Sequence, residues 1–382
     1  MIGLFSVIIL GVVNVGSFSE IFSRSVQGGR LFFNFYDVDI YTSNNFWVVI
    51  LGTTFFWIAV SSCNQLLIQR TCCFPTIKQA KQKMYYRVVY FSIPGFIINI
   101  TQCSLIGLTL YAYYYKCDPV LDGSIKRIDE LVPFFIRQEF HSFPGLTGLF
   151  VVCILSASFS TLSSGFNAIA ALFWEDIFAK RLPNIHPSKA VLITKIIAAL
   201  AGLLCIGLAF LVKEIGTIFE AAFALSAAPI GPLFAIFSMG LFVPFVNSHG
   251  AVVGLISGQL LCFVINFGGL IFKSPSRLLL SSNENCFTKN STFIPFSNLT
   301  NNQIPHYSPQ GWNRLFHISY FIVPMIGYFT ALFLGIIVSL LTGGSNVKNI
   351  NPILVNSYVR KYMQKSIAQD NAVELDNLKT KY

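Results

Sequence analysis

The sequence predicts an all-α membrane protein that crosses the bilayer about eight times. Of its 382 residues, 54% are hydrophobic and only 11% are charged, and the apolar residues gather in long continuous runs. A soluble domain carries about 25% charged residues, so this chain lacks the charge for a solvated surface. Transmembrane strands would instead show short segments that alternate apolar and polar residues. The composition therefore excludes an ordinary soluble enzyme and a disordered chain.

A helix needs about 20 apolar residues to cross a hydrocarbon core that is about 30 Å thick. Runs of this kind predict helices at about 1–18, 46–68, 88–115, 147–173, 190–212, 217–241, 250–272 and 315–341. The first run has no charged segment before it and no clear small-residue cleavage site, so it is interpreted as a helix, with a cleaved signal peptide as the alternative. An apolar run directly after Met1 also fits a chain that begins partway through a longer protein.

Basic residues in the short loops predict the orientation, because cytoplasmic loops carry an excess of Lys and Arg. Loop 69–87 contains basic residues and no acid, loop 174–189 and the tail 342–382 are also basic, and loop 116–146 mixes both signs. We therefore expect both termini in the cytoplasm and the loops 19–45, 116–146 and 273–314 outside. The net charge of +10 then reflects contact with anionic lipid, and no nucleic-acid partner is expected.

The outer loops carry candidate modification sites. Loop 273–314 contains the sequons that begin at Asn290 and Asn298, which predict N-glycosylation on the external side. The two cysteines predicted in outer loops are Cys117 and Cys286. They are expected to form a disulfide if the oxidising compartment brings them together, and two free thiols are an equally open alternative.

Loop 116–146 also contains two apolar patches, Leu131–Phe135 and Phe140–Phe150, which are interrupted by Pro133 and Pro144. We interpret the patches as small interfacial helices at the external face. A lid and a passive connector are both open roles for them.

A stripe of small residues, three of which carry hydroxyls, lies on one face of the fourth predicted helix. Its members stand at i, i+3, i+4 and i+7 and are Ala157, Ser160, Thr161 and Ser164. Hydroxyl oxygens bind a hard cation without carrying charge, which suits a monovalent ion that must bind and then leave, whereas a divalent ion would favour carboxylates. Alternatively, these hydroxyls bond carbonyls of their own helix and allow close helix packing. The pattern alone leaves both interpretations open.

Polar residues in two other predicted helices are further candidates, because polar groups inside a bilayer are costly and mark pathways. Asn64 and Gln65, near the cytoplasmic end of the second helix, line either a cavity or an unwound stretch, with interhelical hydrogen bonding as the alternative. Glu220 lies near the outer end of the sixth helix. It borders a cavity within the membrane or, as the alternative, reaches interfacial water. Pro229 and Pro232 in the same helix predict a break or a kink.

Motifs of ATP-driven pumps and hydrolases are absent from the sequence, which has no GxxxxGK[ST], GxSxG or HExxH. The five His are scattered without metal-ligand spacing. Neither an enzyme nor a cofactor is expected. A channel is a minor alternative, since the sequence has no TVGYG-like filter.

The segment Ser156–Asp176, SASFSTLSSGFNAIAALFWED, resembles the signature helix of the sodium:solute symporter family. It is most similar to the branch that contains sodium-coupled monocarboxylate transporters, the sodium-dependent multivitamin transporter and the sodium/iodide cotransporter. Further segments on both sides of this helix match the same branch in the order in which the family has them. They are Asn64-Gln65, Cys117-Asp118-Pro119, Gly231-Pro232-Leu233 and Leu341-Thr342-Gly343-Gly344.

The resemblance implies a LeuT-type fold, which consists of two inverted five-helix repeats and additional helices. In that frame, residues 1–18 correspond to the last helix of the first repeat, 46–241 to the complete second repeat, and 250–341 to two peripheral helices with their loop. The earlier helices of the first repeat have no counterpart in the sequence.

The resemblance also implies roles for single residues. At the stripe it favours a sodium site over hydroxyls that only bond their own helix. In this family the two hydroxyl ligands fall on Ser160 and Thr161, the backbone carbonyl ligand falls on Ala157, and Ser164 stands where some members place a second polar contact. Asn167 matches an amide that supports the helix.

Asn64 and Gln65 match the broken helix of the second repeat, which borders the substrate cavity. Glu220 stands where an uncharged residue such as Gln is expected in the monocarboxylate branch, and this departure puts the substrate class in doubt. The resemblance implies a plasma-membrane symporter that imports a small organic or inorganic anion together with sodium, its coupling ion. The alternative is a truncated, transport-incompetent product that acts by assembling with a full-length partner.

Overall fold

In the computed structural model, the described residues form helices joined by turns and loops, and no strand is found among them. The structure describes residues 2–31, 39–41, 45–140, 145–212, 218–272, 311–345 and 350–364. Among these residues, seven helices are long and apolar enough to cross a membrane, or up to eight if a bent pair counts as one span. This confirms the all-α fold and the expected number of membrane helices. The chain forms two compact units, which divide between Asn64 and Gln65 and again between Ile218 and Phe219.

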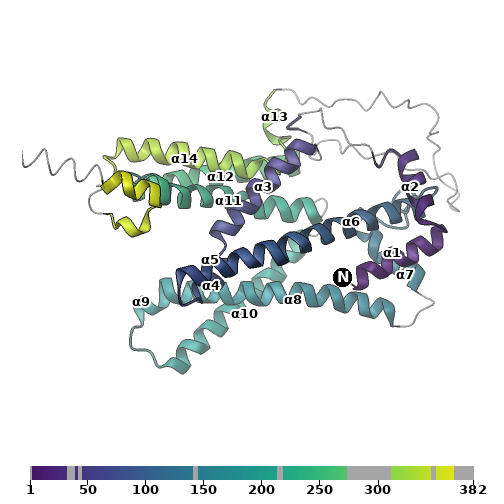
Figure 1. Cartoon of the computed structure of the whole chain (residues 1–382), viewed down its shortest axis with the longest axis horizontal. Coiled ribbons are helices and arrows are strands. Elements are labelled where there is room, and N and C mark those ends of the chain that lie inside the picture. The colour runs from purple at the N-terminus through teal and green to yellow at the C-terminus, as the bar shows by residue number, and fades with distance from the viewer. Residues whose placement is uncertain are drawn as a thin grey trace, which may run out of the picture. The chain divides into compact units, whose positions relative to one another are not determined.

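The first unit holds the helices from the N-terminal segment and from the middle of the chain (Figure 1). They are α1 (Ile2–Val15), α2 (Phe18–Gln27), α4 (Gln65–Cys72), α5 (Ile77–Tyr86), α6 (Ile93–Tyr113), α7 (Leu131–Glu139), α8 (Leu146–Phe173), α9 (Ala179–Arg181) and α10 (Pro187–Val212). The predicted helices at 147–173 and 190–212 agree with α8 and α10 to within a few residues.

The first predicted helix ends in a sharp bend, because α1 and α2 meet at 83°. Gly16 has a φ of 101°, a left-handed conformation that glycine adopts without strain. The Ser17 hydroxyl then accepts a hydrogen bond from the backbone N–H of Ser19 at 3.2 Å and caps α2. Helix α2 therefore occupies the first part of the segment 19–45, and the extracellular position of this segment stays a prediction.

The segment 69–87 is also more helical than expected. A π-helical turn, Arg87–Ser92, joins α5 to α6, and the combined helix Ile77–Tyr113 contains 37 residues. The Thr76 hydroxyl caps this helix by accepting a hydrogen bond from the Gln79 N–H at 3.3 Å. Its first turns are polar but rich in good helix formers, which explains why hydropathy alone predicted a loop. At about 1.5 Å per residue the helix is about 55 Å long, more than a bilayer core of about 30 Å requires.

The short helix α7 packs on a core that α1, α6 and α8 also supply. Phe135 is fully buried there and Ile136 is 1% exposed. The other buried members of this cluster are Val7, Ile8, Ile106, Leu110, Phe140 and Phe150. The first apolar patch of loop 116–146 therefore forms a helix, as expected, whereas the second contributes Phe140 and the start of α8.

Hydrogen bonds at the end of α7 reinforce this packing. The Glu139 carboxylate accepts hydrogen bonds from Asn14 of α1 and Tyr113 of α6. The Tyr114 hydroxyl donates to the Gln138 side-chain oxygen at 3.1 Å. Burial, followed by the neighbouring Tyr113 and Glu139, raises the pKa of Tyr114. These bonds hold α7 to α1 and α6 in the described state, and the lid role stays a prediction.

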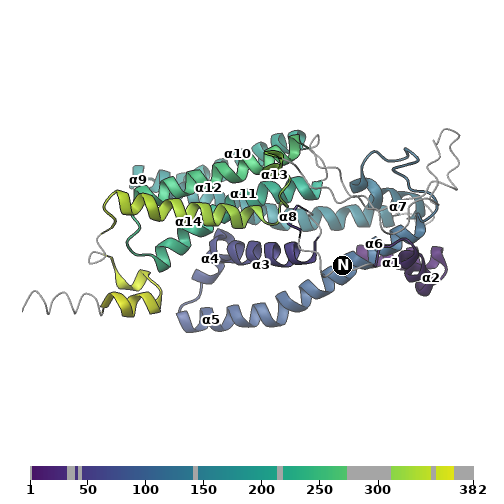
Figure 2. The same cartoon turned by 90° about the horizontal axis from the view of Figure 1, so that it is seen from above.

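The second unit contains the remaining membrane helices and one short helix. The membrane helices are α3 (Phe46–Cys63), α11 (Ile218–Phe242), α12 (Ser248–Ile271) and α14 (Val323–Leu341), and the short helix is α13 (Asn313–Phe316). The last membrane helix begins later than the predicted 315, because Pro324 stands in its first turn, where the missing N–H of proline costs nothing. Figure 2 and Figure 1 both show α12 and α14 side by side.

Glycines let α12 and α14 pack with their backbones in contact. A Cβ atom at Gly254 would lie 2.5 Å from the Ala331 carbonyl oxygen and 3.1 Å from Cα of Gly335. A Cβ atom at Gly258 would lie 2.8 Å from the Gly327 carbonyl oxygen. We call this contact the glycine seam; it matches the small-residue packing that brings helices together in lipid.

Polar groups close the seam at the start of α12. Asn247 caps α12 by accepting a hydrogen bond from the Gly250 N–H at 2.9 Å. Its side-chain amide donates to the Thr342 hydroxyl at 2.7 Å, and its backbone N–H donates to the Ser339 hydroxyl at 3.2 Å. The first residues of α12 and the last turn of α14 are thus tied together.

Helix α11 continues through Pro229 and Pro232 without interruption. Of the two outcomes that the prolines predicted, a break is therefore wrong. Both Gly231 and Pro232 are buried, and a Cβ atom at Gly231 would collide with the Pro324 carbonyl oxygen. Close packing against the start of α14 supports the helix where the prolines remove hydrogen bonds.

Part of the predicted C-terminal tail 342–382 is folded. In residues 350–364, the Asn356 N–H donates to the Leu241 carbonyl near the end of α11 at 3.1 Å. Val355 and Met363 are each only 4% exposed. This segment covers one end of α11 and is not a free tail over its described length.

Candidate ion and solute site

The predicted polar stripe lies on α8, a helix of 28 residues that starts after Gly145, whose φ is 94°. Helical spacing places Ala157, Ser160, Thr161 and Ser164 on one face, as the sequence predicts. Ala157, Ser160 and Thr161 are exposed and Ser164 is half-buried. The stripe thus places three hydroxyl side chains and the Ala157 methyl group along one side of α8.

The hydroxyls around the stripe fall into two groups. The Ser164 hydroxyl donates to the Ser160 carbonyl at 3.1 Å, and the Ser158 hydroxyl donates to the Ile154 carbonyl at 3.0 Å. These two follow the alternative interpretation, in which hydroxyls bond their own helix. The hydroxyls of Ser160 and Thr161 have no hydrogen-bond partner among the described residues. The two predicted side-chain ligands therefore keep their oxygens available.

The helices that carry the site make little contact with the rest of the chain that the structure describes. Only 6% of the most apolar window of α8 is buried, and none of the corresponding window of α10. Unpaired hydroxyls that face hydrocarbon are unfavourable. This exposure favours a stripe that is covered by a ligand, by water or by other protein.

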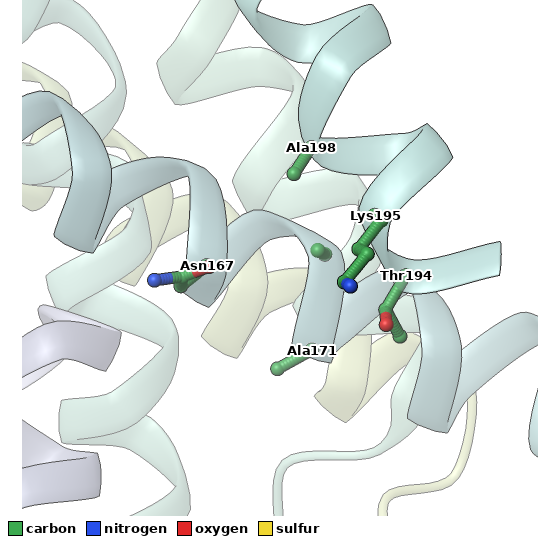
Figure 3. Close-up of a pocket in the computed structure, with 6 residues that line it drawn as sticks. Asn167, Ala171, Thr194, Lys195 and Ala198 are labelled. Carbon is green, nitrogen blue, oxygen red and sulfur yellow. The ribbon is translucent and has the colours of Figure 1, made fainter. Parts of the chain in front are cut away.

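A cavity of about 380 Å³ lies where α8 and α10 meet. It is lined by Asn167, Ala170, Ala171, Thr194, Lys195 and Ala198. Figure 3 shows the Lys195 and Thr194 side chains next to each other on α10, and the Asn167 amide on α8 directed away from Lys195. Asn167 thus stands at the contact between two helices, and its supporting role stays a prediction.

Sequence reasoning did not select Thr194 or Ala198 for this cavity. Both are small residues at i and i+4 on α10, and they face Ala170 and Ala171 of α8 across the cavity. Matching small residues at helical spacing on two successive helices is the signal that would have identified them.

The second helix breaks at Asn64, as its match to a broken helix implies. Asn64 ends α3 with an extended backbone, φ −77° and ψ 117°, and Gln65 begins α4. Both residues are half-buried. Helix α4 packs against α8, so Gln65 belongs to a helix that contacts the stripe-bearing helix. The role of Asn64 and Gln65 toward a substrate stays a prediction.

Glu220 is an exposed residue in the first turn of α11. A carboxylate is favourable at this position because the helix N-terminus carries partial positive charge. Burial and the charge of Glu220 raise the pKa of the nearby Tyr320 to about 12. The Tyr320 ring also packs on Phe219 and Phe223. These contacts place Glu220 at the edge of an aromatic cluster at the end of the helix.

The remaining predicted sites are only partly described. Asn290, Asn298 and Cys286 lie outside the described residues. Cys117 is disulfide-bonded, and its pairing with Cys286 stays a prediction. Among the residues that the structure describes, no three His, Cys, Asp or Glu side chains form a group that would hold a metal ion.

Comparison with known proteins agrees with the resemblance that the sequence showed. The model of the sodium:solute symporter family matches residues 1–258. Sodium-coupled monocarboxylate transporter 2 from Mus musculus is 32% identical over 358 residues, which cover 93% of this chain and 56% of that relative. Sodium-coupled monocarboxylate transporter 1 from Xenopus laevis is 33% identical over 400 residues, which cover 99% and 63%. The sodium-dependent multivitamin transporter from Oryctolagus cuniculus is 32% identical over 358 residues, which cover 92% and 55%.

The chain spans about half the length of the curated relatives it matches, 56% in the first case. A solved structure, the substrate-bound outward-open state of a Na+-coupled sialic acid symporter, matches with a TM-score of 0.61 at 22% identity. That match covers 90% of this chain and 60% of the symporter. It confirms the LeuT-type symporter fold that the resemblance implied. The assignment of individual helices to the two repeats stays a prediction.

Proposed function

The chain belongs to the sodium:solute symporter family, and we propose on this premise that it takes part in sodium-coupled import of a small anion across the plasma membrane. The observation that carries this proposal is the pair of unpartnered hydroxyls, Ser160 and Thr161, on the exposed face of α8. The curated relatives of the chain are transporters. The stripe is therefore proposed to bind an ion and not to carry out catalysis.

Sodium binds between the Ala157 carbonyl and the hydroxyls of Ser160 and Thr161, with Ser164 as an additional polar contact. A carbonyl oxygen that accepts one helical hydrogen bond has a second lone pair for an ion. These few oxygens do not complete a sodium shell, so the remaining ligands are water or oxygens from another part of the symporter. The exposure of α8 provides room for them.

Alternating access then couples the ion to the solute. Sodium stabilises an outward-open state, raises affinity for the anion, and both are released inside after the repeats move. One sodium ion entering the cell is worth about 2.3 kcal/mol per 100 mV of membrane potential. At about 1.4 kcal/mol per tenfold, this drives roughly 40-fold accumulation.

The solute belongs to the class of small anions, since the matched relatives are monocarboxylate and multivitamin transporters. Asn64 and Gln65 at the break between α3 and α4 border its path. Glu220 is a further candidate for the substrate cavity, and its position in the first turn of α11 is electrostatically favourable for its carboxylate.

Uptake of labelled lactate, biotin and iodide tests the proposal in cells that express the chain. We expect uptake of at least one solute in sodium medium and its loss when choline replaces sodium. Uptake that is unchanged by this replacement would contradict sodium coupling. If none of the three solutes enters in either medium although the chain is present at the cell surface, the result favours the transport-incompetent product that stands as the alternative.

Both termini are cytoplasmic in this proposal, and the segment 273–314 is external. Treatment of the expressed protein with a glycosidase that removes N-linked glycans is expected to increase its mobility on a gel. The double variant Asn290→Gln, Asn298→Gln should run at the treated position without the enzyme. Asn99→Gln is the matched control. Asn99 begins a third sequon, Asn99-Ile100-Thr101, but it lies within the membrane helix α6, so this variant should not alter the shift. A shift that survives the double variant would argue against this orientation.

A further inference from the structure

Two adjacent cysteines stand at the end of α4. Cys72 is its last residue and Cys73 is the first of the turn that leads to α5. Both are exposed free thiols, whereas Cys63 and Cys262 are buried. The Cys73 thiol makes one weak hydrogen bond, to the Gln69 carbonyl at 3.2 Å. We call residues 72–77 the cysteine corner; its thiols are open to a reagent.

The surroundings of these thiols are apolar and uncovered. Phe74 is 39% exposed and Ile77 is 77% exposed. Helix α5, which follows, buries none of its residues. Large exposed apolar side chains at the end of a membrane protein's polar segment favour contact with the lipid interface over contact with water.

Charge near the corner also favours a membrane surface. Lys78, Lys81, Lys83 and Arg87 are exposed and form no ion pair among the described residues. No acidic residue stands between Cys72 and Arg87. A basic segment next to a membrane helix is attracted to anionic headgroups by about 1 kcal/mol per Lys or Arg. The corner is thus followed by a second membrane-directed signal.

The chain limits how far the thiols lie from the hydrocarbon. Helix α3 is a candidate membrane span that ends at Cys63, and α4 contains eight residues. At about 1.5 Å per residue, α4 carries the chain at most about 12 Å beyond Asn64. One leaflet of the hydrocarbon core is about 15 Å thick. An acyl chain long enough to fill one leaflet therefore reaches the hydrocarbon from Cys72.

We propose that Cys72 and Cys73 are sites of S-acylation by a long-chain acyl-coenzyme A. A cysteine sulfur attacks the thioester carbonyl, a new carbon–sulfur bond forms, and the bond to coenzyme A breaks. The thiol proton ends on the released coenzyme A, and no group is oxidised or reduced. The acyl chain enters the hydrocarbon and the basic helix α5 contacts the headgroups, so together they hold this corner against the membrane surface. The proposal rests on the cytoplasmic orientation of residues 69–87, where acyl-coenzyme A is available.

Acyl exchange on the full-length chain tests this modification. Free thiols are blocked with N-ethylmaleimide, thioesters are cleaved with hydroxylamine, and the released thiols are coupled to a maleimide polymer that shifts the protein on a gel. We expect a hydroxylamine-dependent shift by one or two polymer units. The shift should be lost in the double variant Cys72→Ser, Cys73→Ser and retained in Cys153→Ser and Cys205→Ser, which remove exposed thiols of α8 and α10.

Three results would overturn the proposal. One is the absence of a hydroxylamine-dependent shift, and another is a shift that persists in the double serine variant. The third is a dithiothreitol-dependent shift that is lost in the double serine variant, which would identify a disulfide at Cys72 or Cys73; the disulfide of Cys117 gives a shift that this variant retains. Labelling of Cys72 and Cys73 by an impermeant maleimide in intact cells would instead show that the orientation is wrong. A failure of sodium-coupled uptake leaves all these readouts unchanged, so the two proposals are tested separately.

Discussion

Replacement of Thr161 by alanine is expected to raise the sodium concentration for half-maximal uptake by roughly 10- to 100-fold. The Thr161 hydroxyl is exposed on α8 and has no partner among the described residues, so its oxygen is available to an ion. Loss of one interaction with a charged group costs about 1.5–3 kcal/mol, and about 1.4 kcal/mol corresponds to a tenfold change in affinity. Initial uptake rates measured over a series of sodium concentrations give this value directly.

Ser158→Ala is the matched control for this substitution. Ser158 is also exposed on α8, but it lies off the stripe and its hydroxyl is bonded to the Ile154 carbonyl at 3.0 Å. We expect its half-saturation constant to stay within about twofold of the unsubstituted protein, as for a surface change. A Thr161→Ala variant with unaltered sodium dependence, or an equal shift in Ser158→Ala, would remove Thr161 from the site.

A second readout of the same site needs no transport. An ion that binds only the folded state stabilises it in proportion to the logarithm of its concentration. Sodium should therefore raise the melting temperature of the purified chain, and Thr161→Ala should reduce this rise while leaving the sodium-free melting temperature in place. This measurement separates loss of the site from loss of activity.

Replacement of Gly254 by valine is expected to destabilise the second unit by about 1–3 kcal/mol or more, the range for overpacked interiors. The added Cβ would stand 2.5 Å from the Ala331 carbonyl oxygen and 3.1 Å from the Gly335 Cα. Both are backbone atoms, so they cannot rotate away as a flexible side chain would, and α12 and α14 must separate. The melting midpoint of a fluorescent fusion in detergent should fall by several degrees.

Gly240→Val is the control for this variant, because a Cβ at Gly240 in α11 would meet nothing within 4 Å. It makes the same chemical change in a helix of the same unit. Its midpoint should change little, since the remaining effect is the small difference in helix propensity between the residues. Equal loss in both variants would mean that valine acts through the helix backbone and not through the glycine seam.

Hydropathy was sufficient to predict the membrane helices because lipid demands long apolar runs. It did not predict α5 or α2, which are polar helices at the ends of apolar ones and depend on caps at Thr76 and Ser17. It also could not exclude a break at Pro229. That outcome depends on the distant Pro324, whose carbonyl contacts Gly231.

Spacing was sufficient to place the stripe on one face of α8, because helical periodicity depends only on the sequence. Spacing could not distinguish Thr161, whose hydroxyl is available, from Ser164, whose hydroxyl bonds the Ser160 carbonyl. That difference follows from side-chain rotation. The cavity beside Asn167 likewise needs two helices, α8 and α10, and a pattern within one helix does not reveal it.

The glycine seam has a consequence for biosynthesis. Gly254 and Gly258 on α12 find their partners on α14, which the ribosome makes only after the intervening segment has been translated. Until then the glycines of α12 have no partner helix in the membrane. The Leu241 carbonyl acquires its hydrogen bond from the Asn356 N–H later still, because Asn356 follows α14 in the sequence. Packing of the second unit is therefore completed only after its C-terminal helix has been made, and a nascent chain that stops before Leu341 leaves the glycines of α12 exposed to the bilayer and its quality-control factors.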